Sequence, residues 1–203
     1  MLDRPAPAWL LAELEQACGE PPRHYPDRRH LGECLVLWTR WRTHCERPVE
    51  VAVALWFHDA VCDPRADDNE PRGAAWAVRS LRAAGVSGAV TQRAHDLVRA
   101  TRHGAPTDEV SLGGNVVVAA DADALLDIDL AILGSRAERF ERYDRDLRLD
   151  YAGVPLGTYT RRRREVLQGL AARAPLYRVA AAVELLQAQA HVNLAAALSR
   201  LQQ

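Results

Sequence analysis

Several signals that assign a chain to a class of protein are missing from this sequence. No stretch reaches the roughly 18 uncharged apolar residues that a membrane-spanning helix needs. The opening MLDRPAPAWLLAELEQ has acidic residues and no long apolar core, which predicts neither a signal peptide nor an anchor. The formal net charge is −1, so nothing indicates a nucleic-acid polymer as a partner. We therefore expect a soluble, cytoplasmic protein.

The cysteines also lack a recognisable pattern. They are scattered along the first third of the chain, without a CxxC pair, as Cys18, Cys34, Cys45 and Cys62. This spacing argues against a disulfide framework and against a zinc knuckle. We interpret the four residues as reduced, partly buried thiols, which agrees with a cytoplasmic compartment.

Sustained alternation with a period of two, which is typical of strands, is absent, and so is any internal repeat. Apolar residues instead recur at helical spacing, which predicts an all-α fold, a helical bundle in a single domain over residues 1–203. The last helix is rich in Ala and Leu, so it should pack along the bundle and can also serve a homodimer contact. The predicted helices span residues 6–18, 30–46, 48–62, 69–84, 87–102, 115–131, 135–152, 156–173 and 176–201.

One segment places charge where the pattern predicts burial. VEVAVALWFHDAV is apolar on every side of a helix, so His58 and Asp59 near its end should be sheltered from solvent. A lone buried carboxylate costs several kcal/mol unless a positive charge compensates it. A divalent metal ion supplies that charge and also binds a neutral imidazole. An isolated His-Asp pair is more often a surface or capping pair, so further ligands are required.

Two other residues can complete a metal site. Asp129 lies in LLDIDLAILG, a carboxylate within an apolar helix, and His30 begins a helical pattern after PPRHYPDRR. Together with His58 and Asp59 they offer two nitrogens and two oxygens. This mixed donor set suits one divalent ion, whether Mn, Fe, Co, Ni, Zn or Mg, and does not choose among them.

The order of these residues on a helical chain resembles the HD-domain superfamily of metal-dependent phosphohydrolases. Motifs between about residues 20 and 180 are similar to a bacterial family described as predicted metal-dependent HD phosphohydrolases: RHYPDRRH, LWFHDAVCDP, DDNEPRGA, ATRH, DIDLAILG, RYDRDLRLDY and VLQGLAARAPLY. The resemblance implies an HD-type helical bundle with one divalent ion and phosphohydrolase activity. It also implies His30, His58, Asp59 and Asp129 as the metal ligands. The chain departs from the family at Pro26, where relatives usually carry a second histidine, and at Cys62, where they tend to carry tyrosine.

A metal-bound water still needs a group that handles its proton and the leaving group. The loop after the His-Asp pair carries the candidate catalytic residues Asp63, Asp68 and Glu70, of which Glu70 is the first choice. The structural alternative is that Asp68 or Asn69 caps the next helix and Glu70 lies favourably in its first turn. Asp63 can equally be a turn residue before Pro64.

Four further residues are candidates for substrate binding. His103 and Arg102 end a helix and can hold a phosphate oxygen, although a C-terminal histidine can also simply complement the helix dipole. Tyr143 and Arg148 lie in RYDRDLRLDY, where they can bind substrate or build a salt-bridged face.

The leading hypothesis is a phosphohydrolase that acts on a small phosphorylated molecule, such as a nucleotide. A second hypothesis is a di-iron HD-type oxygenase, in which His95 or His103 must supply extra ligands. A third is a protein that binds metal and ligand without turnover. No glycine-rich phosphate cradle or base-stacking motif is present, so the sequence does not identify the substrate.

Overall fold

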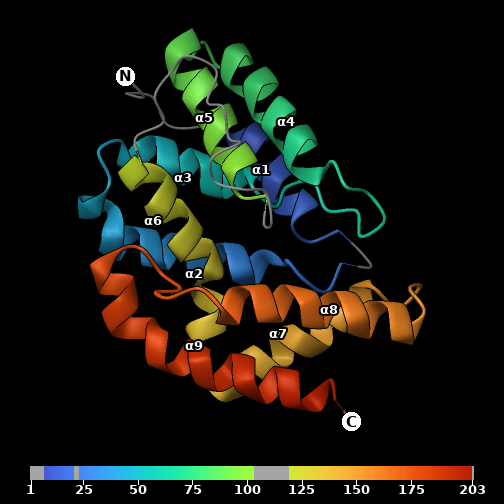
Figure 1. Ribbon diagram of the computed structural model, residues 1–203. Helices are drawn as coiled ribbons and strands as arrows, with labels where there is room; N and C mark the ends of the chain where they lie inside the picture. The colour runs from blue at the N-terminus through green and yellow to red at the C-terminus, as the bar shows by residue number, and fades with distance from the viewer. Residues whose placement is uncertain (1–6, 21–22, 103–118, 203) are drawn as a thin grey trace. The chain divides into compact units, whose positions relative to one another are not determined.

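The computed structural model describes residues 7–20, 23–102 and 119–202, and over these residues it is helical with no strand (Figure 1). The predicted all-α class is therefore confirmed. Within the same residues no helix is both long enough and apolar enough to cross a membrane.

Each predicted helical segment contains a helix, and the spacing of apolar residues located them correctly. The α-helices are α1 (Ala8–Ala17), α2 (Arg28–Trp41), α3 (Pro48–Phe57), α4 (Asn69–Ala83), α5 (Gly88–Ala100), α6 (Ala119–Asp129), α7 (Ala137–Asp150), α8 (Leu156–Ala171) and α9 (Ala180–Arg200). Among the described residues, the short 3₁₀ helices η1 (Arg42–His44) and η3 (Leu130–Gly134) continue α2 and α6.

One boundary was predicted wrongly in a way that matters for the site. The helix expected over 48–62 ends at Phe57, so Asp59 lies in the turn after α3 and His58 is its C-cap. The His58 imidazole Nδ1 binds the Leu55 carbonyl oxygen at 2.8 Å and so satisfies a carbonyl that the helix end leaves without an amide partner. Next to this end, α4 approaches closely, since a Cβ on Gly73 would lie only 2.9 Å from the Phe57 oxygen.

A second boundary, that of α9, differs because of a side chain. The helix begins at Ala180 and not at residue 176. The amides of Leu176 and Tyr177 donate instead to Gln187 Oε1, at 3.1 and 3.4 Å, and the Tyr177 hydroxyl donates to the Leu130 carbonyl oxygen at 3.1 Å. These bonds hold the segment before the helix in a turn.

The chain divides into two compact units, residues 1–129 and residues 130–203. Each has its own buried apolar residues, such as Val51 and Leu97 in unit 1 and Phe140 and Leu194 in unit 2. The single-domain organisation stays a prediction.

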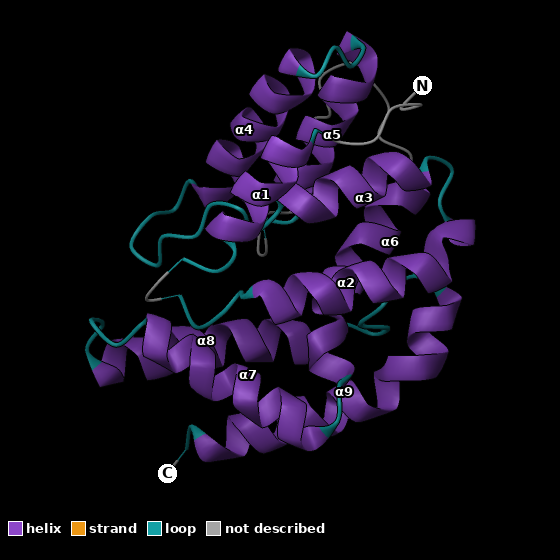
Figure 2. Ribbon diagram, turned by 180° about the vertical axis from the view of Figure 1, so that it is seen from behind, coloured by secondary structure: helices purple, strands orange, loops and turns teal. Residues whose placement is uncertain are grey.

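In unit 1, α3 is the central element. It packs against α2, α4, α5 and α6, and α4 and α5 lie side by side in both views (Figures 1 and 2). Two polar contacts anchor it. Arg93 of α5 donates to both carboxylate oxygens of Glu50 at 2.7 and 2.6 Å, and Asp121 of α6 accepts from the amides of Glu46 and Arg47 at 2.8 and 3.1 Å. These contacts hold the start of α3 against α5 and α6, at the opposite end of the helix from His58.

In unit 2, α9 packs against η3 and α8, and α7 packs against η3. The close approach of α9 to η3 explains why residue 134 is glycine. A Cβ at this position would lie 2.6 Å from Leu186 Cβ and 2.7 Å from the Leu186 carbonyl oxygen. Asn193 of α9 donates to the carbonyl oxygens of Leu133 and Ser135, both at 2.8 Å. The end of the DIDLAILG motif is thus explained by helix packing within this unit.

Candidate metal centre

His30 is positioned by the start of α2. Asp27, in an extended conformation, is the N-cap, and its side chain accepts from the His30 amide at 2.9 Å. This cap fixes the first turn of the helix, from which the buried imidazole extends. The Tyr25 hydroxyl lies 3.2 Å from His30 Nδ1, on the opposite side of the ring from Nε2.

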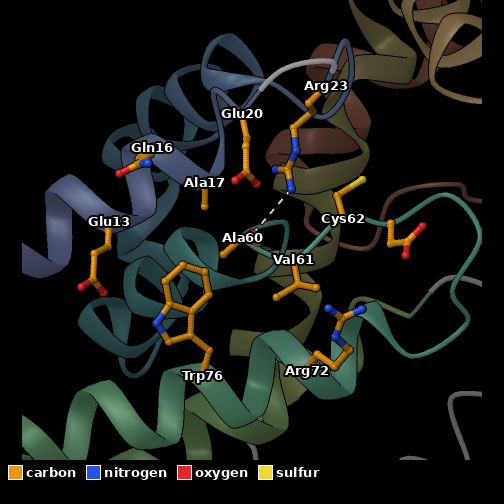
Figure 3. Close-up of a pocket in the computed structure, with 11 residues that line it drawn as sticks. Glu13, Gln16, Ala17, Glu20, Arg23, Ala60, Val61, Cys62, Arg72 and Trp76 are labelled. Atoms are coloured by element: carbon orange, nitrogen blue, oxygen red, sulfur yellow. Dashed lines mark hydrogen bonds between the residues drawn. The ribbon is translucent and has the colours of Figure 1, made fainter.

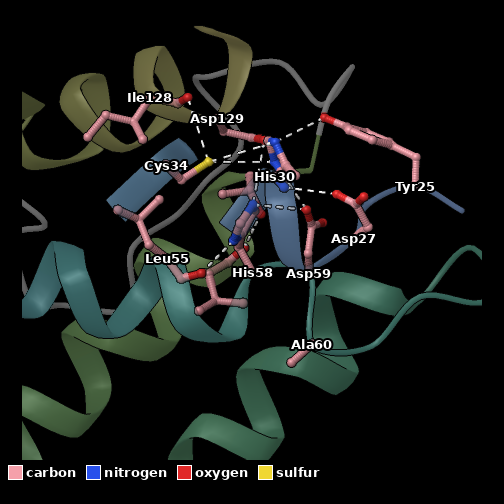
Figure 4. Close-up of polar contacts among 12 residues, drawn as sticks. Tyr25, Asp27, His30, Cys34, Leu55, His58, Asp59, Ala60, Ile128 and Asp129 are labelled. Carbon is pink, nitrogen blue, oxygen red and sulfur yellow. Dashed lines mark hydrogen bonds and ion pairs between the residues drawn. The ribbon is translucent and has the colours of Figure 1, made fainter. Parts of the chain in front are cut away.

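The other predicted ligands come from two element ends in the same unit. His58 and Asp59 follow α3, and Asp129 is the last residue of α6, which packs against both α2 and α3. Figure 4 shows the side chains of these residues and of His30 converging on one point. We call His30, His58, Asp59 and Asp129 the four-donor cluster.

The spacing within the four-donor cluster is that of ligands around one ion. Each histidine Nε2 lies between 3.0 and 3.5 Å from the nearer carboxylate oxygens of Asp59 and Asp129. All four donor atoms lie within 4.8 Å of one another. With bonds of about 2.1 Å, adjacent ligands lie about 3.0 Å apart around an octahedral ion and about 3.4 Å apart around a tetrahedral one. The cluster can therefore hold a metal ion.

The environment of His58 supports the same conclusion. Its Nδ1 faces the Leu55 carbonyl, which only accepts, so Nδ1 carries a proton and Nε2 is left to face the carboxylates. Although Nε2 lies 3.0 Å from Asp59 Oδ2, it is buried and makes no hydrogen bond of acceptable geometry within the described residues. Buried polar atoms normally have a hydrogen-bond partner, and a histidine nitrogen that lacks one is expected of a metal ligand in the metal-free protein.

The electrostatics of the cluster require positive charge. Burial alone would lower the pKa of His58, but the neighbouring Asp59 and Asp129 carboxylates hold it well above its usual range. The pKa of His30 is likewise raised well above its usual range, against the effect of burial, by Cys34 and Asp129. Burial alone would raise the pKa of Asp59, but the charge of His58 lowers it. A divalent cation would compensate the negative charges of Asp59 and Asp129, as protons on His30 and His58 do in its absence.

Sequence reasoning missed a fifth residue beside the cluster. Cys34 lies one turn after His30 on α2, is buried, and has its sulfur 3.6 Å from His30 Nε2. It also forms a potential metal-binding group with His30 and His58. The available signal was its position four residues after His30, which places both side chains on one face of a helix.

An open pocket of about 380 Å³ adjoins the His-Asp segment (Figure 3). The Arg23 guanidinium lines it and donates to the Asp59 carbonyl oxygen at 2.8 Å, which links the pocket wall to the cluster. Arg72 and the Trp76 indole from α4 line another part of the wall. The pocket thus brings two guanidinium groups and an aromatic ring next to the turn that carries Asp59, together with the carboxylates of Glu13, Glu20 and Asp63.

The three predicted catalytic acids occupy different places. Asp63 lines the pocket, and its Oδ1 accepts from the Arg65 amide at 2.9 Å, as expected of a turn residue. Asp68 is the N-cap of α4 without a side-chain capping bond, and Glu70 lies in the first turn of that helix. Among the described residues, none of the three belongs to a group that can hold a metal.

The predicted substrate-binding residues are not brought to the cluster by any described contact. Arg102 is exposed just beyond α5, and His103 lies outside the described residues. In unit 2, Arg148 stacks on the Tyr159 ring, 4.7 Å from its centroid, and donates to the Tyr151 carbonyl, which closes the end of α7. Tyr143 is buried beneath Arg163. These are packing contacts of unit 2, and a role in substrate binding stays a prediction.

His95, which the oxygenase hypothesis needs as an extra ligand, has other partners. Its Nδ1 lies 2.8 Å from Asp96 Oδ1 and 3.4 Å from the Gln92 side-chain nitrogen, all on α5. In the part of the chain that the structure describes, it joins neither of the groups that can hold a metal.

No family model, curated protein or solved structure matches the chain. The resemblance to HD-domain phosphohydrolases therefore depends on the sequence motifs, and function must be argued from the cluster and the pocket beside it.

Proposed function

We propose that the protein is an HD-domain-type, metal-dependent phosphohydrolase that uses one divalent ion to cleave a small phosphate ester. The observation that carries the proposal is the four-donor cluster, in which two imidazole nitrogens and two carboxylate oxygens meet at the separations that one ion requires. Two nitrogens and two oxygens from the protein leave coordination positions for water and substrate.

A divalent ion held there supplies the Lewis-acid chemistry that lets water attack phosphorus near neutral pH. The protein residues around the ion determine the side from which substrate can reach it. Asp59 is 30% exposed, whereas His58 is almost completely buried, so the open side of the site is the side of Asp59. Arg23, bonded to the Asp59 carbonyl, holds that side in place.

The pocket next to Asp59 offers the guanidinium groups of Arg23 and Arg72 to a phosphorylated substrate, although carboxylates also line it. Arg72 is paired with Asp68 only at 3.7 Å on the surface, so its guanidinium can turn to bind phosphate oxygens. Trp76 offers an apolar, aromatic wall for the rest of the substrate. Of the three predicted acids, Asp63 is the one that lines this pocket, and we assign it the proton transfer to the leaving group.

The proposal is tested in two steps on the full chain. Protein purified without chelator is first analysed for metal, and we expect one divalent ion per chain. A phosphate-release screen over nucleotides and small phosphoesters, with Mn, Co, Ni, Mg and Zn, should then identify a substrate. Two tightly bound irons and oxygen-dependent turnover would instead favour the oxygenase, and bound metal without turnover would favour a binding protein.

Asp59→Ala is the decisive variant, because it removes one cluster ligand from the exposed side of the site. It should abolish metal retention and lower phosphate release by at least about 10³-fold, as expected when a metal cofactor is lost. Asp67→Ala, which changes an exposed acid in the loop after α3, is the matched control and should behave as the wild type. Phosphatase activity that survives in Asp59→Ala would overturn the assignment.

A further inference from the structure

We propose that the substrate of this site is a small phosphate monoester whose alcohol part carries a positively charged amine. The inference rests on the proposed phosphohydrolase function and adds the chemical class of the substrate. It comes from the charges around the pocket beside Asp59, where carboxylates face the same space as guanidinium groups. A phosphate group alone explains only the guanidinium groups.

Opposite charges lie toward different ends of this pocket. Figure 3 shows the guanidinium groups of Arg23 and Arg72 toward the end that Cys62 lines. Glu13 and the Trp76 indole lie toward the other end. The guanidinium end is the one connected to the proposed metal centre, because Arg23 donates to the carbonyl oxygen of the residue before Ala60. A phosphate held near the ion therefore has guanidinium groups around it and a carboxylate beyond it.

The charges at the two ends are not neutralised within the described part of the chain. Arg23 donates to the carbonyl oxygens of Asp59 and Ala60, which orient its guanidinium and leave its positive charge uncompensated. Neither Glu13 nor Glu20 has an ion-pair partner among the described residues. One cavity thus keeps free charges of both signs, and a ligand with a negative and a positive end compensates both.

The end that Glu13 lines suits an ammonium group. Trp76 is half-buried, and the Phe57 ring packs against it edge to face, with 6.0 Å between the ring centroids, so the indole is held in place. A cation is attracted both to the face of an indole and to a carboxylate. Gln16, three residues after Glu13 on α1, adds an amide oxygen as an acceptor on the same helix face.

Other kinds of substituent gain less at this end. An alkyl group gains only the contact with the indole, and it leaves the carboxylates of Glu13 and Glu20 without a cation. A second or third phosphate group would extend toward these carboxylates and be repelled by them. The volume of about 380 Å³ is at the lower end of the range for small-molecule sites, which agrees with a short ester.

Hydrolysis of such an ester needs no co-reactant except water. The water oxygen bonds to phosphorus, the P–O bond to the alcohol breaks, and Asp63 passes a proton to the departing alcohol oxygen. The ammonium group keeps its charge throughout. The products are inorganic phosphate and a free amino alcohol.

The test compares ligands that differ only in an ammonium group in place of a methyl group. ω-Aminoalkylphosphonates with three to six carbons are paired with alkylphosphonates one carbon longer. Water does not hydrolyse them, so isothermal titration into the full chain, loaded with the divalent ion that it retains on purification, measures binding alone. We expect the amine of at least one pair to bind about 10-fold more tightly. The matching esters, from 2-aminoethyl phosphate and propyl phosphate upward, should show the same preference in kcat/KM for phosphate release.

Variants assign the preference to the carboxylates. Glu13→Gln combined with Glu20→Gln keeps the size of both side chains and removes their charge, so the preference should fall below about 3-fold without weaker binding of alkylphosphonates. Glu15→Gln changes an exposed acid of α1 that does not line the pocket, and it should keep the full preference. Added salt should reduce the preference in the wild type, because these charges are open to solvent.

The outcomes separate this inference from the proposed function. Equal affinity within every pair, or a preference that survives in the double variant, would overturn the substrate class, and phosphate release from propyl phosphate would leave the phosphohydrolase standing. Faster hydrolysis of nucleoside monophosphates than of every amino ester would overturn the class in favour of a base that stacks on Trp76. An amine preference in binding without phosphate release from any ester would support the ligand class and overturn the phosphohydrolase.

Discussion

At the scale of single residues, hydrogen bonds on the outer side of each imidazole decide which nitrogen is available. The Leu55 carbonyl accepts from His58 Nδ1 at 2.8 Å, and the Tyr25 hydroxyl lies 3.2 Å from His30 Nδ1. Both arrangements direct Nε2 toward the carboxylates. Partners of this kind orient metal-ligating histidines and raise their basicity, so they should contribute to affinity without touching the ion.

Tyr25→Phe tests this contribution, because it removes the hydroxyl and keeps the ring. We expect the affinity for Zn²⁺ or Co²⁺ to fall by about 10- to 100-fold, the usual effect of losing such a partner. Isothermal titration of metal into the metal-free protein measures the change. Thermal unfolding of metal-free Tyr25→Phe is the control, and an unchanged affinity in a folded variant would show that Tyr25 does not orient His30.

A different residue, Cys45, gives a prediction of pH dependence. Burial, together with the nearby charge of Asp121, raises the pKa of its thiol to about 11 from an ordinary 9.0. At pH 8 the thiolate fraction should therefore be about 100-fold smaller than in the unfolded chain, and alkylation correspondingly slower. Mass spectrometry of alkylated Cys45, with and without denaturant, measures the ratio.

The same shift fixes the sign of a stability effect. The folded state holds this proton more tightly than the unfolded state, so the contribution of Cys45 is complete below pH 9 and is lost as the pH rises toward 11. Equal alkylation rates in the folded and unfolded chain would contradict the assignment.

The residues of the site were only partly predictable. His58 and Asp59 stood out because charge in an apolar run demands an explanation. Asp129 was found as a carboxylate in another apolar helix, and His30 as a histidine at the start of a helical pattern. Cys34 and Tyr25 did not stand out, because a buried thiol and a tyrosine before a helix are ordinary in a sequence. Their significance depends on distances to His30 that only the folded chain provides.

At the scale of elements, the position of the His-Asp pair depends on how α3 is held at both ends. At the end of α3, the His58 side chain binds the Leu55 carbonyl oxygen. Just before its start, the backbone amides of Glu46 and Arg47 donate to Asp121. Helical spacing predicted that α3 and α6 exist. It did not predict where α3 ends, because Ala60 and Val61 continue the apolar pattern. In the structure the helix ends at Phe57, where the His58 side chain binds the Leu55 carbonyl oxygen.

Asp121→Ala should measure what this anchor contributes. The change leaves two backbone amides near the start of α3 without their acceptor, which we expect to lower the free energy of unfolding by about 1–3 kcal/mol. Urea unfolding followed by circular dichroism provides the value. Asp121→Asn keeps a side-chain oxygen as an acceptor and should recover most of the loss. A variant as stable as the wild type would show that water replaces the carboxylate at no cost.

At the scale of the whole molecule, every ligand of the proposed centre lies in unit 1, and Asp129 is the residue at which that unit ends. An ion there ties together α2, α3 and α6 over about a hundred residues of chain. Binding to the folded state alone must stabilise that state, by about 2.7 kcal/mol when the free metal concentration is 100 times the dissociation constant. The effect should therefore be visible in a probe that reports on unit 1.

The tryptophans provide that probe, because all five lie in unit 1, at positions 9, 38, 41, 56 and 76. Adding Zn²⁺ should move the fluorescence unfolding transition of the full chain to higher urea, and His58→Ala should abolish the shift. Circular dichroism reports on both units. If the chain is the single domain that its length predicts, the two transitions coincide and move together. A second dichroism transition that zinc leaves unmoved would mean that residues 130–203 unfold on their own, because no ligand from that unit holds the ion.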